Sequence, residues 1–191
     1  MGKIESQFIA TELPGNGGES AEQRVWDAVR RSFRHRTCLA YWRYPIFSQT
    51  GKTRKEPDIL IADRQWGLFI LEVKAIAIDR ILRIHGHQWQ LQNFYATQIN
   101  PYQQAENQLN AIVQYCDAEP LLQGSVTARV GVALPQIDRE QWQQRGFDRL
   151  PSAPPILFSD QLTETETFLE AIAAIPVLRH GNPSTPEQRR S

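Results

Sequence analysis

The sequence predicts one α/β domain whose central sheet is covered by helices on both faces. Three observations support this fold class. Two segments repeat apolar residues at helical spacing, and several short runs are apolar on both alternating faces, as in strands that are buried on both sides. The segments follow one another as helix, three strands, helix and strand. We expect the domain to span residues 1–178 and a polar tail or linker to occupy residues 179–191.

The first predicted helix covers residues 21–34. Ser20 and Gln23 form a capping-box pattern just before apolar residues at helical spacing. Residues 38–47, CLAYWRYPIF, are rich in aromatic side chains and are predicted to form a strand.

A hairpin follows, with strands predicted at 57–63 and 68–74 and a turn between them at RQWG. The loop before this hairpin, between residues 47 and 57, contains GKT, the end of a phosphate-binding motif. Ile46 stands where that motif needs its first glycine, so we reject a nucleotide-binding loop. Residues 80–92 predict a smaller hairpin that turns at His-Gly-His.

The second predicted helix runs from Pro101 to about Cys116. Asn100 supplies an N-cap, Pro101 suits the first turn, and Gln103 completes the capping pattern. The remaining predicted elements are a strand at 125–135, a short helix at 138–145, a strand at 154–160 and a helix that opens at Asp160.

Composition is that of an ordinary globular chain, with 41% apolar and 22% charged residues. No apolar run approaches the length that spans a bilayer, and the start lacks a secretory signal pattern, so we expect a cytoplasmic protein without a membrane partner. Formal net charge is zero, which argues against a global electrostatic grip on nucleic acid. The basic runs 30–36 and 52–55 are typical of solvated faces or loops.

The second strand of the main hairpin carries two opposite charges in an apolar context. Glu72 and Lys74 share a face because side chains alternate along a strand. If the hairpin pairs symmetrically about Gln65, opposing positions sum to 130, which sets Asp58 across from Glu72 with Cβ atoms roughly 5 Å apart. Two carboxylates and one ammonium are therefore predicted at the open end of the hairpin.

Two like charges at that separation repel by roughly 3 kcal/mol at an effective dielectric of ~20. A divalent cation between Asp58 and Glu72 would relieve this repulsion, and oxygen ligands suit Mg²⁺. Glu22 lies on the apolar face of the first helix, where it is either an end-of-helix residue that reaches solvent or a third acid of the same site; the presence of Asp58 and Glu72 favours the third acid. Lys74 could orient or help to deprotonate a metal-bound water for attack on a phosphodiester. The alternative is an internal ion pair without catalysis.

These residues resemble the core of the PD-(D/E)XK nuclease superfamily, and within it the nuclease-related domain, or NERD domain. The likeness covers about residues 18–113 and rests on the start of the first helix, EPDILI, GLFILEVK, the Gly and Trp spacing in HGHQW, and NPYQQA. Ala75 departs from the pattern, because a glycine or polar residue is common after the lysine.

The resemblance implies a restriction-endonuclease-like core of order αβββαβ with a central mixed sheet, and metal-dependent hydrolysis of DNA with Mg²⁺ or Mn²⁺. It implies metal ligation by Glu22, Asp58, Glu72 and the Val73 carbonyl, with Lys74 as the catalytic lysine. Gln104 resembles the polar residue of the following helix. The helical wheel alone does not choose between Gln103 and Gln104; the N-P-x-x-Q-A spacing favours Gln104.

Several alternatives stay open. The chain could be a catalytically inactive module that binds nucleic acid or regulates, and RNA is not excluded as a substrate because nothing in the sequence reads a 2′-hydroxyl. His85 and His87 share a predicted strand face and offer a weaker, zinc-type alternative. The tail STPEQRR resembles the start of a helicase domain, in which a glutamine reads adenine. The family resemblance separately implies frequent linkage to helicase or kinase domains. The sequence does not indicate an oligomeric state.

Overall fold

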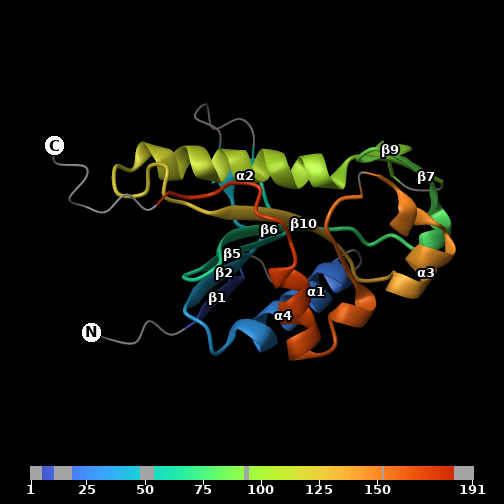
Figure 1. Cartoon of the computed structure of the whole chain (residues 1–191), viewed down its shortest axis with the longest axis horizontal. Helices are drawn as coiled ribbons and strands as arrows, with labels where there is room; N and C mark the ends of the chain where they lie inside the picture. Colours follow the sequence, from blue (N-terminus) through green and yellow to red (C-terminus); the bar gives the residue numbers. More distant parts are fainter. Residues whose placement is uncertain (1–5, 11–18, 48–53, 93–94, 152, 183–191) are drawn as a thin grey trace.

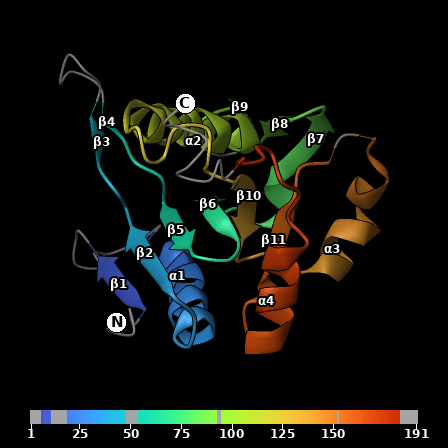
Figure 2. The ribbon, with the colours of Figure 1, turned by 60° about the vertical axis from the view of Figure 1, so that its left-hand side comes forward.

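A computed structural model describes residues 6–10, 19–47, 54–92, 95–151 and 153–182 of the chain. Its centre is a six-stranded sheet, seen in Figures 1 and 2, in the order β1-β2-β5-β6-β10-β11. The pairs β2-β5 and β5-β6 are antiparallel, and the other three pairs are parallel, so the sheet is mixed. The strands are β1 (Gln7–Ala10), β2 (Cys38–Trp42), β5 (Ile59–Asp63), β6 (Gly67–Val73), β10 (Ala128–Leu134) and β11 (Ile156–Phe158).

Helices cover both faces of this sheet, as the sequence predicted (Figure 1). Helices α1 (Glu19–Phe33) and α4 (Thr165–Ala173) pack on one face, where Val29 and Phe168 join the odd-numbered residues of β6 in one core. Helix α2 (Pro101–Ala118) covers the other face and packs against Ile70. The α/β fold with a central mixed sheet is therefore confirmed.

The α2 helix begins as its cap residues predict. The Asn100 side chain accepts a hydrogen bond from the Gln103 N–H, and Pro101 occupies the first helical position. This cap fixes where the helix starts relative to β6. Gln104 and Gln108, one helical turn apart near this start, consequently reach Lys74 and Glu72 at the end of β6.

A smaller unit packs against the end of the sheet. It contains the three-stranded sheet β7-β8-β9 and helix α3, whose Trp142 packs at a tilt against Trp89 in a separate apolar core. Asp138 caps α3 with a complete capping box. The bounds are β7 (Ile81–His85), β8 (Gln88–Leu91), β9 (Gln98–Ile99) and α3 (Arg139–Gln144), with 3₁₀ turns η1 (Ile78–Arg80), η2 (Phe147–Arg149) and η3 (Ser159–Gln161).

The predicted strand 38–47 is wrong as one element, because the chain breaks after Trp42. Arg43 adopts φ = 58°, a left-handed conformation that ends an extended strand. Residues beyond it form the separate short strand β3 (Ile46–Phe47), which pairs with β4 (Arg54–Lys55) away from the central sheet. The loop between β3 and β4, residues 48–53, lies outside the described residues.

Two other elements differ from the sequence predictions. The edge strand β1 was not predicted; its four residues are largely exposed and show no apolar alternation. Helix α4 begins at Thr165 rather than Asp160, because the 3₁₀ turn η3 comes first. Within the predicted tail, Arg179 pairs with Ala128. Residues 183–191, which include all of STPEQRR, lie outside the described residues.

Candidate active site

The hairpin of β5 and β6 brings Asp58 and Glu72 to the same face of the sheet. Ile59 pairs with Leu71 and Leu60 with Ile70, so opposing positions sum to 130, as the sequence predicted. Asp58 immediately precedes β5 and stands opposite Glu72 in this register. The even-numbered residues of both strands, the set to which Asp58 and Glu72 belong, face α2, whereas Ile59 and Leu71 face α1. The two acids therefore meet beneath the first turns of α2.

Glu72 is buried, with 1% of its surface exposed, and both of its carboxylate oxygens have partners. Oε1 accepts a hydrogen bond from Lys74 Nζ at 2.6 Å, and Oε2 accepts one from Gln108 Nε2 at 3.2 Å. Burial raises the pKa of Glu72 and the nearby charge of Glu22 adds to this, although the Lys74 ammonium opposes both effects. The site thus holds a carboxylate that its own burial disfavours.

Lys74 is also buried, and it stays charged. Burial by itself would lower its pKa, but the charge and hydrogen bond of Glu72, with smaller effects from Tyr95 and Asp58, raise the pKa above its ordinary value. Gln104 Oε1 accepts a second hydrogen bond from Nζ at 3.2 Å. The ammonium is therefore fixed between β6 and α2 as a donor of hydrogen bonds.

Asp58 lies beside the backbone of β6. Its Oδ2 accepts a hydrogen bond from the Val73 N–H at 2.7 Å. Burial, and then the charges of Glu72 and Glu22, raise the pKa of Asp58 well above its usual value. In an extended strand the N–H and C=O of one residue point to the same edge, so the Val73 carbonyl is directed to the Asp58 side. The Asp58 carboxylate and the Val73 carbonyl, both predicted as metal ligands, therefore lie on the same side of β6.

Glu22, the third predicted acid, lies near this region but is held by other groups. Its Oε2 accepts hydrogen bonds from Trp42 Nε1 at 2.7 Å and Arg43 Nε at 2.9 Å, and its Oε1 accepts one from Arg43 Nη2 at 3.1 Å. Accordingly, within the described ranges no group of three or more His, Cys, Asp or Glu side chains is arranged to hold a metal ion.

The residues present nevertheless fit a divalent cation of the Mg²⁺ type, which commonly uses one or two carboxylates and retains several waters. Asp58, Glu72 and the Val73 carbonyl are all hard oxygen donors. A buried atom supports an additional polar occupant: Gln108 Oε1, on a side chain only 3% exposed, has no hydrogen-bond partner among the residues that the structure describes. The donor set does not match zinc, which prefers nitrogen and sulfur ligands.

Sequence reasoning missed Gln108 and Arg43. Gln108 lies one helical turn after Gln104 and so shares its face, which was the available signal. Its Nε2 bridges Glu72 and the Glu56 carbonyl. Arg43 gave no signal, because its role depends on a left-handed backbone that the strand pattern does not indicate. Gln103, the open alternative to Gln104, contacts Asn107 instead.

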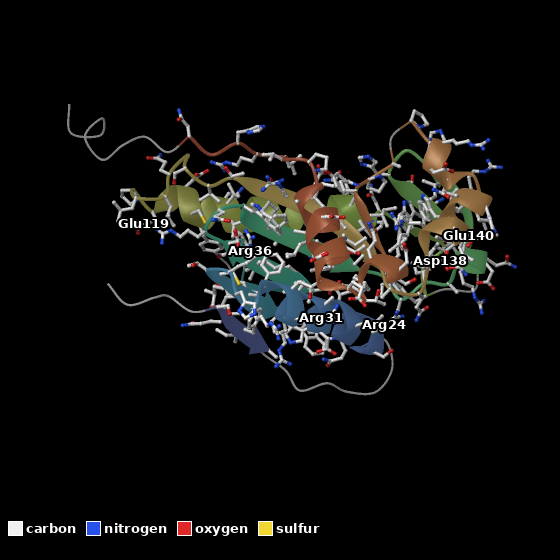
Figure 3. The ribbon with its side chains drawn as sticks, turned by 60° about the horizontal axis from the view of Figure 1, so that its bottom comes forward. Arg24, Arg31, Arg36, Glu119, Asp138 and Glu140 are labelled. Carbon is white, nitrogen blue, oxygen red and sulfur yellow. The ribbon has the colours of Figure 1, made fainter. Side chains whose placement is uncertain are left out.

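The other candidate features of the sequence are structural or peripheral. His87 packs edge-on against Tyr102 at 4.8 Å between ring centroids, and His85 is exposed. Within the basic run, Arg31 donates to the Leu162 carbonyl at 2.5 Å and Arg36 to the buried Asp63. Arg31 and Arg36 are labelled with Arg24 in Figure 3. Arg31 thus links α1 to the segment before α4, and Arg36, just after α1, binds the end of β5.

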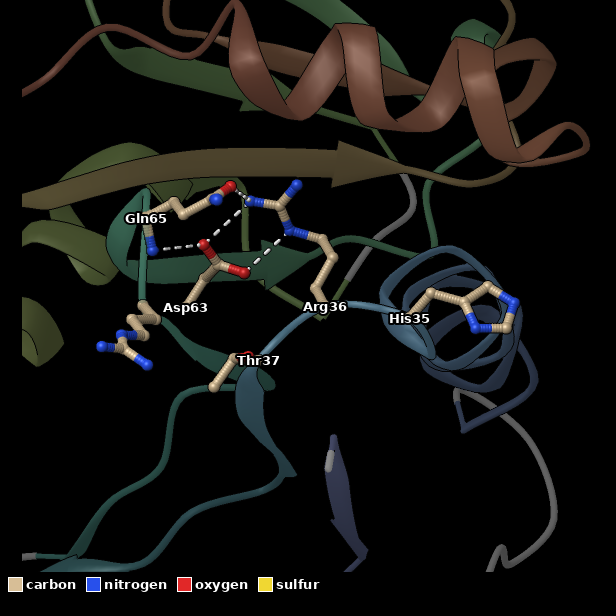
Figure 4. Close-up of a pocket in the computed structure, with 6 residues that line it drawn as sticks. His35, Arg36, Thr37, Asp63 and Gln65 are labelled. Atoms are coloured by element: carbon tan, nitrogen blue, oxygen red, sulfur yellow. Dashed lines mark hydrogen bonds and ion pairs between the residues drawn. The ribbon is translucent and has the colours of Figure 1, made fainter. Parts of the chain in front are cut away.

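A pocket of about 470 Å³ lies at the opposite end of β5 from Asp58 (Figure 4). Arg36 and Asp63 both line this pocket. The Arg36 guanidinium donates hydrogen bonds from Nε and Nη2 to the Asp63 carboxylate. The same guanidinium stacks on Trp66 at 3.7 Å from the ring centroid. The positive charge of Arg36 is thus neutralised internally, and the pocket is separate from the acids.

A mixed sheet with α1 and α4 on one face and α2 on the other, and an Asp, a Glu and a Lys at the end of its central hairpin, define a restriction-endonuclease-like nuclease fold. Comparison with protein families gives a match to the nuclease-related domain over residues 17–133, more than half of the chain. The chain belongs to this NERD family, consistent with the PD-(D/E)XK superfamily. Comparisons with curated proteins and with solved structures gave no match. None of the helices in the described ranges is long and apolar enough to cross a membrane.

Proposed function

We propose that this NERD domain is a metal-dependent nuclease that hydrolyses DNA phosphodiester bonds with Mg²⁺ or Mn²⁺. The observation that supports the proposal best is the pair of facing acids, Asp58 and Glu72, with the Lys74 ammonium 2.6 Å from Glu72. A fold that needed only an ion pair here would not need a second carboxylate opposite it, because the added repulsion raises the cost of burial.

Asp58, Glu72 and the Val73 carbonyl are the proposed metal ligands, with Glu22 as a further ligand when its carboxylate is available. A bound cation would supply Lewis acidity and lower the pKa of a coordinated water. Lys74 is held protonated by Glu72, so its proposed role is to orient the attacking water and stabilise charge on the phosphate. Gln104 and Gln108 fix the positions of Lys74 and Glu72.

The test is cleavage of supercoiled plasmid DNA and of matched single-stranded DNA and RNA in the presence of Mg²⁺ or Mn²⁺. Wild-type protein should cleave DNA, and Asp58→Asn and Lys74→Met should each lower the rate by at least about 100-fold. Gln103→Ala is a matched control on the same helix, because its side chain contacts Asn107 and not the acids. Equal cleavage by all four proteins would refute the proposal.

A second candidate is a catalytically inactive nucleic-acid-binding or regulatory module of the same fold. The observation that favours it is the engagement of Glu22 by Arg43 and Trp42, which leaves the site one acid short. DNA binding that is unaffected by Asp58→Asn, with no cleavage under either metal, would support it.

Addition of a DNA helicase to the cleavage assay tests the proposed linkage to a helicase domain in cis or in trans.

A further inference from the structure

Arg43 combines an unusual backbone with contacts to both sides of the candidate site. Outside glycine, it is the one residue in the described part of the chain with a positive φ, 58°. Such a conformation is uncommon for a long side chain and persists where surrounding contacts fix it. Its N–H donates to the Asp58 carbonyl at 2.9 Å, so the turn is attached to the segment that carries one of the acids.

The Arg43 side chain reaches in the other direction, to helix α1. Two of its guanidinium nitrogens, Nε and Nη2, bind the two different oxygens of Glu22 at 2.9 and 3.1 Å. This two-point geometry is the strong form of a charge-assisted hydrogen bond, and it constrains the orientation of the carboxylate. Trp42 Nε1 adds a third donor at 2.7 Å. The side chains of Arg43 and Glu22 are only 22% and 16% exposed, so solvent screens the pair weakly.

Glu22 is nevertheless within electrostatic reach of the acid pair. Its negative charge contributes to the raised pKa of both Asp58 and Glu72. The geometry agrees, because Trp42, a donor to Glu22, pairs with Ile59 beside Asp58, and Arg43, the other donor, binds the Asp58 carbonyl through its N–H. A third carboxylate in this position would join an ion held by Asp58 and Glu72 if its oxygens were available, because cations of this type accept several oxygen ligands. In the described structure those oxygens are satisfied by Arg43 and Trp42, which explains why only two acids face the site.

We propose that Arg43 is a positioning residue that withholds Glu22 from the cation. While the Arg43–Glu22 ion pair is closed, the site offers two carboxylates; when it opens, the site offers three. This inference rests on the proposed metal-dependent function. It assigns to Arg43 control over how tightly the cation binds, because affinity for such ions increases with the number of charged ligands.

Isothermal titration calorimetry with Mn²⁺ tests the inference without any substrate. Arg43→Asn removes the guanidinium and keeps a residue that tolerates positive φ. We expect Mn²⁺ to bind about tenfold more tightly to this variant, the order of change typical for a residue that contacts a ligand rather than the metal. Arg43→Gly also suits a positive φ and should show the same tighter binding of Mn²⁺. It replaces Arg43→Asn in the titration if that variant folds poorly.

Loss of a positive charge would itself favour a cation, so the decisive comparison removes Glu22 as well. In the wild-type background Glu22→Gln should change the Kd for Mn²⁺ by less than about twofold, whereas in the Arg43→Asn background the same substitution should cost about tenfold. Arg43→Lys keeps the charge but not the two-point contact, and should lie between wild type and Arg43→Asn. Arg64→Asn, at the far end of β5, is the matched control for charge and should leave the Kd unchanged.

Two results would overturn the inference: no tightening in Arg43→Asn, or the same tightening whether or not Glu22 is present. Either result leaves the proposed nuclease activity intact if wild-type protein still cleaves DNA with metal. Failure of the proposed function looks different, because wild-type protein would then bind no Mn²⁺ and would not cleave DNA; the inference would fall with it.

Discussion

Replacement of Asp58 by Asn should stabilise the metal-free protein. Asp58 and Glu72 oppose each other in the hairpin register, with Cβ atoms about 5 Å apart, and two charges at that distance repel by roughly 3 kcal/mol at an effective dielectric of ~20. Lys74 cancels part of this repulsion. Asparagine retains a carbonyl that can accept the Val73 N–H, so little is lost in exchange. We expect the free energy of unfolding to rise by about 1–2 kcal/mol.

For a domain of this size that gain corresponds to a rise in Tm of roughly 3–6 °C, measurable by differential scanning calorimetry at pH 7 in EDTA. Millimolar Mn²⁺ should reverse the order of stability. Wild-type protein should gain about 2.7 kcal/mol when free Mn²⁺ exceeds the Kd a hundredfold, and Asp58→Asn should gain much less. Asp148→Asn, at an exposed carboxylate, is the control and should match wild type in both buffers.

A Tm of Asp58→Asn below that of wild type in EDTA would refute the proposed repulsion between Asp58 and Glu72. That result would mean that the carboxylate stabilises the fold through its hydrogen bond to Val73 and that repulsion from Glu72 is small. An equal response of both proteins to Mn²⁺ would instead show that any bound ion lies elsewhere.

Two further predictions concern the scaffold. Burial favours the neutral form of Asp63, but hydrogen bonds from Arg36 and from two backbone N–H groups, together with the Arg36 charge, lower its pKa below the ordinary value of an aspartate. Its stabilising effect is therefore fully present above that ordinary value and is lost as the pH falls through the folded-state pKa. Asp63→Asn should therefore cost about 2 kcal/mol at pH 7 by urea denaturation, and the difference from wild type should shrink below pH 4; a difference independent of pH would contradict this. Gly67→Ala should cost about 2–4 kcal/mol, because φ is +86° and a Cβ would lie 2.2 Å from the Thr127 carbonyl oxygen. Gly86→Ala, with φ of +60° and open space around its Cβ position, should cost only about 1 kcal/mol in the same assay, and equal losses at both glycines would show that the close contact does not matter.

Much of the candidate site could be predicted because it is built on a local hairpin. A symmetric turn fixes the register, and the register places Asp58 opposite Glu72 without any knowledge of distant contacts. The shared face of Glu72 and Lys74 follows from strand alternation alone. Helix α2 was predictable for a similar reason, because Asn100 and Pro101 mark its start.

The features that could not be predicted depend on contacts between distant segments. Strand β1 is short and exposed, and its place in the sheet comes from parallel pairing with β2 rather than from its own pattern. The break at Arg43 is stabilised by Asp58 and Glu22, neither of which is near in sequence. Helical periodicity placed Glu22 on the apolar face of α1. It carries no information about the ion pair with Arg43, which comes from another segment.

The most direct test of the central claim is a crystal structure of the protein soaked in Mn²⁺, with data collected at the manganese absorption edge. We expect an anomalous peak about 2–2.3 Å from carboxylate oxygens of both Asp58 and Glu72, on the side of the Val73 carbonyl. A peak that is absent from this position at a Mn²⁺ concentration that supports DNA cleavage, or that lies beside other residues, would contradict it.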